Sequence, residues 1–279
     1  MDAAQIKRAL SEAGLRPNAA LGQNFCVDEA RLAAIADAAD VAGRPVLEVG
    51  PGLGALTEPL LARAARVVAV EKDAALAALL SARLAAAGAR LAVYTADILR
   101  FDVAAAMEAA PGNPGNPGAT APGAAFCVAG NLPYYITTPI VERLLPLLPL
   151  SLTLMVQREA AARFSAGPGA RVYGPVAAFS QLCYTVQHVM DVPRDSYYPQ
   201  PDVDSSVVRL ARRDALPDAE PAALLAFLHR AFAMRRKTLW NNLARSPQAA
   251  AALGLPADVR AEALPPAALL AVFQALNGS

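Results

Sequence analysis

Short apolar runs alternate along this chain with longer segments whose apolar positions recur at helical spacing. Their length and flanking turn residues are typical of buried strands. The predicted strands cover residues 45–49, 67–71, 90–94, 125–129 and 151–156. Strands that alternate with helical segments predict an α/β fold, a mainly parallel sheet with helices on both faces.

The pattern changes in the second half of the chain. Segments 186–192 and 203–210 are joined by a proline-rich stretch, and we expect them to form an antiparallel pair at one edge of the sheet. After Arg213 the pattern becomes helical and rich in alanine. We therefore predict an α/β domain over residues 1–213 and a small helical domain over residues 214–279.

Two local signals refine this outline. Asp28 is expected to cap a helix that runs to about Ala39. Residues 111–123 repeat Pro, Gly and Asn, which predicts a flexible surface loop. This loop enters the fourth strand at its amino end, so it should not touch a site at the opposite edge of the sheet.

Glycines and polar residues stand where the first four strands end. The turn Gly50 to Gly54 comes directly after the first strand, and Glu71, Asp97 and Asn131 stand at the ends of the next three. Ligands of open α/β sheets bind at the carboxyl ends of the strands. We therefore expect one site that is built from four strand ends.

The glycine turn fits two kinds of cofactor. Glycines let the backbone approach a ligand closely, and the spacing of Gly50, Gly52 and Ala55 also satisfies a dinucleotide fingerprint. However, Glu48 places an acid near the position that a pyrophosphate would occupy, and Pro51 stands inside the turn. Both features favour S-adenosylmethionine over NAD.

The next two strand ends offer contacts for an adenosine. Asp97 can accept a hydrogen bond from an adenine amine while Ile98 packs on the ring, and Glu71 can bind both ribose hydroxyls. An acid after a strand can instead stabilise the start of the next helix. We assign that alternative role to Asp73 and the ribose contact to Glu71.

The turn after the fourth strand suits chemistry on a planar amino group. The exocyclic nitrogen of adenine is a poor nucleophile because its lone pair is delocalised into the ring. The amide oxygen of Asn131 and the carbonyl of Leu132 can accept its two protons, and Pro133 fixes the backbone that holds this carbonyl. Tyr134 offers a flat face for a base. The alternative is an ordinary strand-to-helix turn with a buried tyrosine.

In order and spacing these motifs resemble the ribosomal RNA adenine N6-dimethyltransferases. The resemblance extends from about residue 16 to about residue 245, and it is strongest to the small-subunit enzymes, which dimethylate two adjacent adenines in a hairpin near the 3′ end of the RNA. The segments that carry it are 21–25, 48–54, Glu71, Asp97, 130–134, 198–210 and 235–239.

The resemblance implies a Rossmann-like class I methyltransferase fold with a seven-stranded sheet, S-adenosylmethionine as cofactor, and direct methyl transfer without a metal. It gives the catalytic role to Asn131, Leu132, Pro133 and Tyr134. The expected cofactor contacts are Gln23, Asn24, Cys26, Gly50, Gly52, Glu71, Lys72, Asp97, Ile98 and Asn131. Cys26 stands where the family usually has leucine, but cysteine is small and apolar enough to serve.

The implied partner is small-subunit ribosomal RNA in an assembling 30S particle. A net charge of +1 is low for an RNA-binding protein, so binding must come from local patches. The densest basic cluster contains Arg230, Arg235, Arg236 and Lys237, and a second candidate patch contains Lys7, Arg8 and Arg16. We predict that Arg235, Arg236 and Lys237 bind RNA, although cations also favour helix ends. Phe179 is a candidate for the second face of the target base, with a core aromatic as the alternative.

Composition indicates in which cellular compartment the protein is expected and which kinds of site are not expected. The 279 residues are 55% hydrophobic and 18% charged. No run of about 18 apolar residues lacks charge or proline, so no membrane span is expected, and the first residues lack a secretory pattern. Three widely spaced cysteines and two histidines predict neither a disulfide framework nor a metal site. We expect a cytoplasmic monomer.

Two other functions remain open at this point. A DNA adenine N6-methyltransferase shares the amine-binding turn, but no separate domain for double-stranded DNA is evident. A ribosome-assembly factor that inspects immature particles, with incidental methylation, would carry the same basic cluster.

Overall fold

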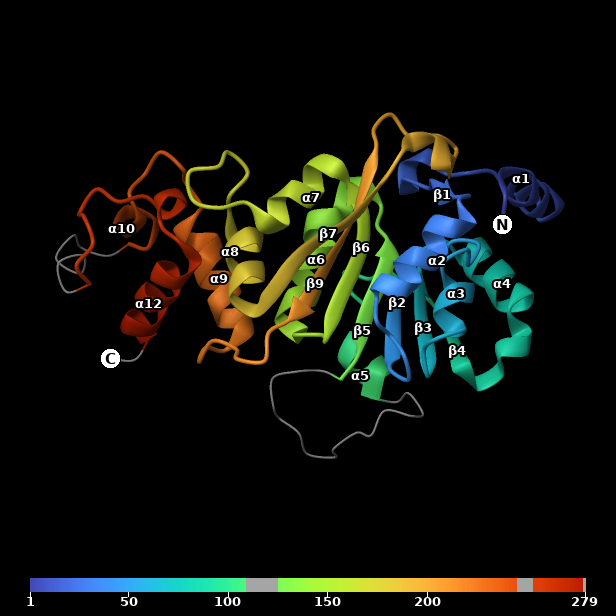
Figure 1. Cartoon of the computed structure of the whole chain (residues 1–279), viewed down its shortest axis with the longest axis horizontal. Helices are drawn as coiled ribbons and strands as arrows, with labels where there is room; N and C mark the ends of the chain where they lie inside the picture. The colour runs from blue at the N-terminus through green and yellow to red at the C-terminus, as the bar shows by residue number, and fades with distance from the viewer. Residues whose placement is uncertain (109–124, 245–252, 278–279) are drawn as a thin grey trace.

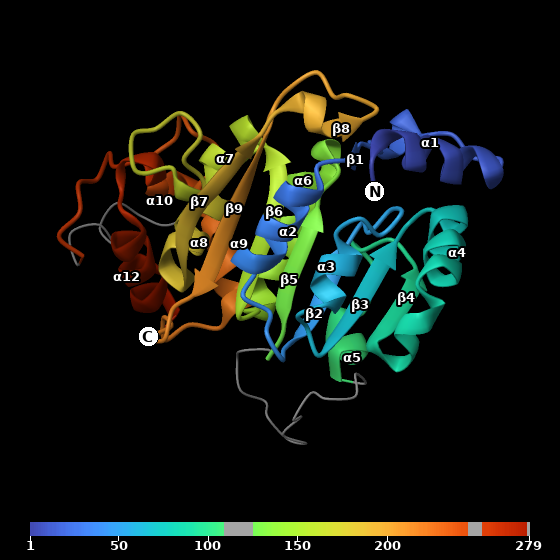
Figure 2. The same cartoon turned by 45° about the vertical axis from the view of Figure 1, so that its right-hand side comes forward.

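The computed structural model describes residues 1–108, 125–244 and 253–277. A seven-stranded sheet runs through the middle of the molecule, with helices on both of its faces (Figure 1 and Figure 2). The strands are β1 (Phe25–Cys26), β2 (Pro45–Val49), β3 (Arg66–Glu71), β4 (Leu91–Thr95), β5 (Cys127–Asn131), β6 (Ser151–Gln157), β7 (Tyr184–Val192), β8 (Tyr197–Tyr198) and β9 (Ser205–Arg212).

The order of strands in the main sheet is β4-β3-β2-β5-β6-β9-β7. Strands β2 to β6 are parallel, whereas β9 is antiparallel to both β6 and β7. Strands β1 and β8 form a separate antiparallel pair. The predicted mainly parallel sheet with an antiparallel pair at one edge is therefore confirmed.

Helices cover both faces of the sheet (Figure 1). The α-helices are α1 (Ala3–Glu12), α2 (Glu29–Ala38), α3 (Thr57–Leu61), α4 (Ala74–Arg83), α5 (Val103–Glu108), α6 (Thr137–Leu144), α7 (Arg158–Ser165), α8 (Pro175–Cys183), α9 (Pro221–Ala231), α10 (Leu239–Asn242) and α12 (Pro266–Asn277). The short 3-10 helices are η1 (Ala19–Leu21), η2 (Ala85–Arg90), η3 (Tyr134–Ile136), η4 (Leu145–Leu147), η5 (Arg194–Ser196) and η6 (Ala261–Ala263). In Figure 2, α2 and α3 lie in front of the sheet, and α8 and α9 lie behind it. Helix α1 lies at one end of the molecule, while α10 and α12 lie at the other (Figure 1).

Burial on both faces explains why the central strands appear as continuous apolar runs. Leu47 and Val49 of β2 belong to the apolar cluster that includes α6, α8 and α9, whereas Val46 belongs to the cluster with α2 and α3. Side chains alternate between the faces of a strand, so a strand covered on both sides is apolar throughout.

The start of α2 is capped as predicted. The side chain of Asp28 accepts a hydrogen bond from the backbone N–H of Arg31 at 3.0 Å. The Pro- and Gly-rich segment 111–123 lies outside the described residues. The division of the chain at residue 213 remains a prediction, although α9 packs closely against α8.

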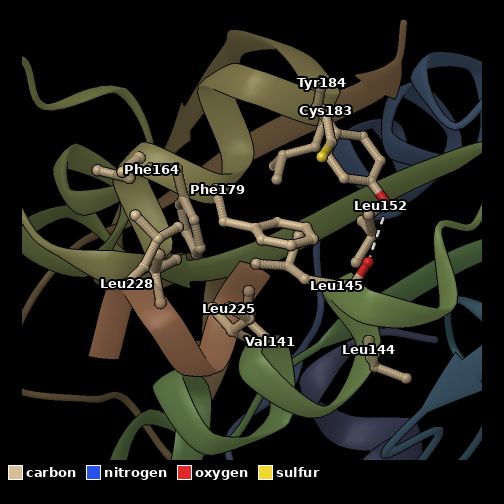
Figure 3. Close-up of a cluster of buried hydrophobic side chains, with 14 of the residues drawn as sticks. Val141, Leu144, Leu145, Leu152, Phe164, Phe179, Cys183, Tyr184, Leu225 and Leu228 are labelled. Carbon is tan, nitrogen blue, oxygen red and sulfur yellow. Dashed lines mark hydrogen bonds between the residues drawn. The ribbon is translucent and has the colours of Figure 1, made fainter. Parts of the chain in front are cut away.

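The prediction for Phe179 is wrong. Its side chain is 0% exposed, and Figure 3 places it on α8 among Val141 of α6 and Leu225 and Leu228 of α9. Such a ring cannot reach a base. Aromatic residues on an amphipathic helix are driven into the core because burying a ring removes a large apolar area from water.

Gly130 lies at a close approach between the neighbouring strands β5 and β2. A Cβ atom there would lie 2.6 Å from the carbonyl oxygen of Val49, which is backbone and cannot turn aside. We expect Gly130→Ala to lower the free energy of unfolding by about 1–3 kcal/mol, the usual cost of overpacking. Chemical denaturation measures this change. Gly167→Ala is the control, because a Cβ there meets nothing within 4 Å. Equal stability of the two variants would contradict a tight contact at Gly130.

Candidate active site

A cleft lies at the carboxyl ends of strands β2 to β5. It is lined by the glycine turn, by the ends of the neighbouring strands and by the segment around β1. Every residue expected to contact a cofactor lines it: Gln23, Asn24, Cys26, Gly50, Gly52, Glu71, Lys72, Asp97, Ile98 and Asn131. The fold also brings Leu132, Pro133 and Tyr134 to the same cleft.

The glycine turn is held by an acid from the next strand. Gly50 and Gly52 have φ values of 67° and 56°, in the left-handed region that favours glycine. One carboxylate oxygen of Glu71 accepts from the N–H of Gly52 at 3.0 Å, and the other accepts from the N–H of Asp73 at 2.9 Å. Glu71 therefore orders the turn as well as lining the cleft, which the sequence did not predict.

The neighbouring strands β2 and β3 each carry a buried acid, Glu48 and Glu71. Burial raises the pKa of Glu71, and the backbone N–H groups of Asp73 and Gly52 oppose this effect. Burial raises the pKa of Glu48 to about 8, the Thr57 hydroxyl lowers it, and the charge of Glu71 raises it. Glu48 is only 1% exposed, and this burial favours the protonated form of its carboxyl.

The end of β4 carries Asp97, an acid whose pKa is lowered, in contrast to the raised pKa of Glu48. The ammonium of Lys72 lies 2.9 Å from one carboxylate oxygen of Asp97, and the N–H of Leu99 donates to the other at 3.0 Å. The hydrogen bond from Lys72 and then that from Leu99 lower the pKa of Asp97. Asp97 is therefore ionised and able to accept further hydrogen bonds.

The segment before β1 crosses the cleft and is tied at two points. The side-chain amide of Gln23 donates to Asp73 at 3.0 Å, and the side-chain amide of Asn131 donates to the carbonyl of Asn24 at 2.9 Å. Asp73 also caps α4 by accepting from the N–H groups of Ala75 and Leu76, which is the helix-start role assigned to it.

Two acceptors remain unused at the end of β5. The amide nitrogen of Asn131 donates to Asn24, and its amide oxygen receives no hydrogen bond from the residues that the structure describes. The N–H of Leu132 donates to Met155 at 3.0 Å, while its carbonyl oxygen receives no donor from the described residues. The carbonyl of Pro133 is already bonded by Ile136 and Thr137. The turn therefore offers two rigid acceptors to a ligand.

The tyrosine of this turn is anchored from far along the chain. The hydroxyl of Tyr134 lies 2.7 Å from that of Ser205 in β9, which is 0% exposed. Nearby, Tyr197 of β8 pairs with Cys26 of β1, and burial raises the pKa of the Cys26 thiol to about 11, so it acts as a packing group. Sequence analysis missed Ser205, since no local pattern links residues so distant.

The basic cluster divides into two kinds of residue. One guanidinium nitrogen of Arg235 donates to the carbonyls of Arg171 at 2.7 Å and Tyr173 at 3.4 Å, so it holds the loop before α8. Arg236 and Lys237 are exposed and form no ion pair within the part of the chain that the structure describes. In the second patch, the ammonium of Lys7 lies 4.8 Å from the ring centre of Tyr198.

The described residues hold neither a metal cluster nor a membrane-spanning helix. In residues 1–108, 125–244 and 253–277, no group of three or more His, Cys, Asp or Glu could hold a metal ion. None of the helices in these ranges is long and apolar enough to cross a membrane.

The sheet order, the glycine turn and the acids at successive strand ends define a Rossmann-like methyltransferase. A family model described as ribosomal RNA adenine dimethylase matches residues 14–277. The chain therefore belongs to this family of RNA-methylating enzymes.

Individual relatives agree with the family. A protein of Deinococcus radiodurans named ribosomal RNA small subunit methyltransferase A is 42% identical, and the match covers 98% of this chain and 90% of the relative. A Phenylobacterium zucineum protein of the same name is 39% identical over 97% of this chain and 92% of its own.

Solved structures share the fold. The 23S rRNA methyltransferase ErmE has a TM-score of 0.63 and 27% identity, over 91% of this chain and 99% of its own. A dimethyladenosine transferase from Plasmodium falciparum has a TM-score of 0.71 and 22% identity, over 91% of this chain and 98% of its own. At this identity the similarity is one of fold.

The buried Glu48 predicts a pH-dependent cost to stability. Its pKa rises on folding, so the folded state binds more protons than the unfolded state between about pH 4.5 and pH 8, and stability falls as pH rises through this window. Glu48→Gln mimics the neutral acid and should have the higher Tm at pH 8, with a gap that shrinks towards pH 5. Melting curves across this range test it. A gap that is constant with pH would show that Glu48 is ionised in the folded protein.

Proposed function

We propose that this chain transfers methyl groups from S-adenosylmethionine to the N6 atoms of two adjacent adenines in a hairpin near the 3′ end of small-subunit ribosomal RNA. The observation that carries this proposal is the pair of unused acceptors at the end of β5. An adenine amine has two protons and needs two acceptors. The names of the relatives support the small subunit as the target.

The cleft fits the cofactor in charge and shape. Ionised Asp97 would accept from the adenine amine, Ile98 would pack on the ring, and Glu71 would bind the ribose hydroxyls. The turn at Gly50 and Gly52 leaves room for close approach of the rest of the molecule. S-adenosylmethionine would supply a methyl group bonded to a sulfonium sulfur. The neutral thioether that remains after transfer is a good leaving group.

The contribution of the protein is to position and prepare the amine. Acceptance of both amine protons by Asn131 and Leu132 draws the nitrogen lone pair out of conjugation with the ring. The bond from Asn131 to Asn24 stops the amide from rotating, so this arrangement exists before the base arrives. Tyr134 stacks on the target base, and an unpaired loop base is cheaper to extract than a stacked one.

In this proposal, exposed basic residues outside the cleft bind the RNA. Arg236 and Lys237 are free to contact phosphates, which supply affinity with little sequence information. The partner in this proposal is an assembling 30S particle in the cytoplasm, and the enzyme acts as a monomer.

The amine clamp is tested by Asn131→Ala. Loss of a preorganised polar contact in a transition state usually costs about 10²–10³-fold in kcat, and we expect this range with little change in cofactor affinity. Methyl transfer to unmethylated particles and calorimetry with S-adenosylmethionine measure the two quantities.

Asn131→Asp is the matched control for the clamp. It keeps an acceptor oxygen but cannot donate to the carbonyl of Asn24, so it should retain more activity than Asn131→Ala. Near-normal turnover of Asn131→Ala on saturating particles would overturn the clamp.

The docking role is tested by neutralising Arg236 and Lys237 together as glutamines. Each lost phosphate contact should make the salt dependence of particle affinity shallower by about 0.7–0.9 in logarithmic slope. Cofactor affinity should not change. Arg235→Gln provides the comparison, since it removes bonds to two carbonyls and should lower Tm. An unchanged slope in the double variant would argue against phosphate contacts.

A further inference from the structure

We propose that Ser205 is a positioning residue for methyl transfer, whose hydroxyl holds the ring of Tyr134 in the orientation that stacks on the target adenine. The inference rests on the proposed function, because it assigns a partner to the tyrosine that receives the base. It adds a residue from β9, an antiparallel strand outside the four strand ends that form the cofactor site.

The geometry favours a fixed anchor. The two hydroxyl oxygens are 2.7 Å apart, the ordinary distance for an O–H···O bond. Ser205 is fully buried, and its backbone is paired with Gln157 of β6 on one side and Val192 of β7 on the other. A hydroxyl on a strand that is held from both sides cannot follow a moving ring, so the ring must stay with it.

Tyr134 needs such an anchor because its own backbone gives little support. It is the first residue of η3, a three-residue turn that has no side-chain cap. The turn is closed mainly by the carbonyl of Pro133, which accepts from Ile136 and Thr137 rather than from Tyr134. Without the bond to Ser205, the ring would lose its hydrogen bond to the main sheet, and rotation about its side-chain torsions would be less restricted.

The same bond distinguishes two adjacent tyrosines. Tyr135 also lines the cleft but is 54% exposed, whereas Tyr134 is half-buried and tied to the sheet. Burial raises the pKa of Tyr134, against the effect first of the Ser205 hydroxyl and then of the Tyr197 hydroxyl, so the phenol remains neutral. Its hydroxyl therefore serves as a hydrogen-bonding handle and not as a base.

The chain supplies a matched control in the next residue. Ser206 is also buried, at 1% exposure, but its hydroxyl donates to Asp191 at 2.7 Å. Successive side chains point to opposite faces of a strand. Ser206→Ala thus removes the same atom from the same strand without touching Tyr134.

The experiment compares four variants of the full chain with the unaltered enzyme: Ser205→Ala, Tyr134→Phe, the double variant and Ser206→Ala. Methyl transfer is measured at saturating S-adenosylmethionine on unmethylated small-subunit particles, with cofactor affinity from calorimetry and folding from melting curves. Tyr134→Phe removes the same hydrogen bond from the other partner, so the test stands even if Ser205→Ala folds poorly.

We expect Ser205→Ala and Tyr134→Phe each to lower kcat by about three- to tenfold, the fold-change for one ordinary hydrogen bond. The double variant should be no slower than either single variant, since both remove one interaction. Cofactor affinity should be unchanged throughout, and Ser206→Ala should match the unaltered enzyme.

Three results would overturn the positioning role. They are normal turnover by Ser205→Ala or Tyr134→Phe, losses that multiply in the double variant, and an equal loss in Ser206→Ala. These results are distinct from failure of the proposed function, in which the unaltered enzyme itself does not methylate the particles.

Discussion

The hydrogen bond from the side chain of Asn131 to the carbonyl of Asn24 is the contact on which the site depends. It joins the end of the central strand β5 to a segment 107 residues earlier in the chain, and it fixes which side of the amide faces the ligand. The amide oxygen and the neighbouring carbonyl of Leu132 are left without donors from the described residues. A planar amine with two protons matches this arrangement.

The sheet holds this contact in place, and three acids, Glu48, Glu71 and Asp97, line the cleft around it. One carboxylate oxygen of Glu71 accepts from the glycine turn and the other from the N–H of Asp73, and Asp97 is kept ionised by Lys72. Glu48 is buried as a neutral acid at some cost to stability. Polar groups that lower stability in this way cluster at ligand sites, and here all three acids line the same cleft.

Much of the fold and of the candidate site could be predicted from the sequence, because both depend on local patterns of apolar and polar residues. Five strands have mainly apolar runs, and parallel strands bring the residues at their carboxyl ends, including Glu71, Asp97 and Asn131, to one edge of the sheet. The features that could not be predicted depend on contacts between distant segments. The bond of Tyr134 to Ser205 and the bond of Arg235 to the loop before α8 join distant residues and produce no periodic pattern in the sequence. The burial of Phe179 depends on how α8 and α9 pack, which the spacing of apolar residues alone does not settle.

The most direct test of the amine clamp is to identify the atom that receives the methyl group. Unmethylated small-subunit particles are incubated with the enzyme and labelled S-adenosylmethionine, and the modified nucleosides are then identified and mapped by mass spectrometry. We predict N6,N6-dimethyladenine at two adjacent positions of the small-subunit RNA. Methylation at a ring nitrogen or at a ribose would contradict the clamp, because neither group presents two protons to the two acceptors at the end of β5. Methylation at the amine of another base would contradict the assignment of adenine.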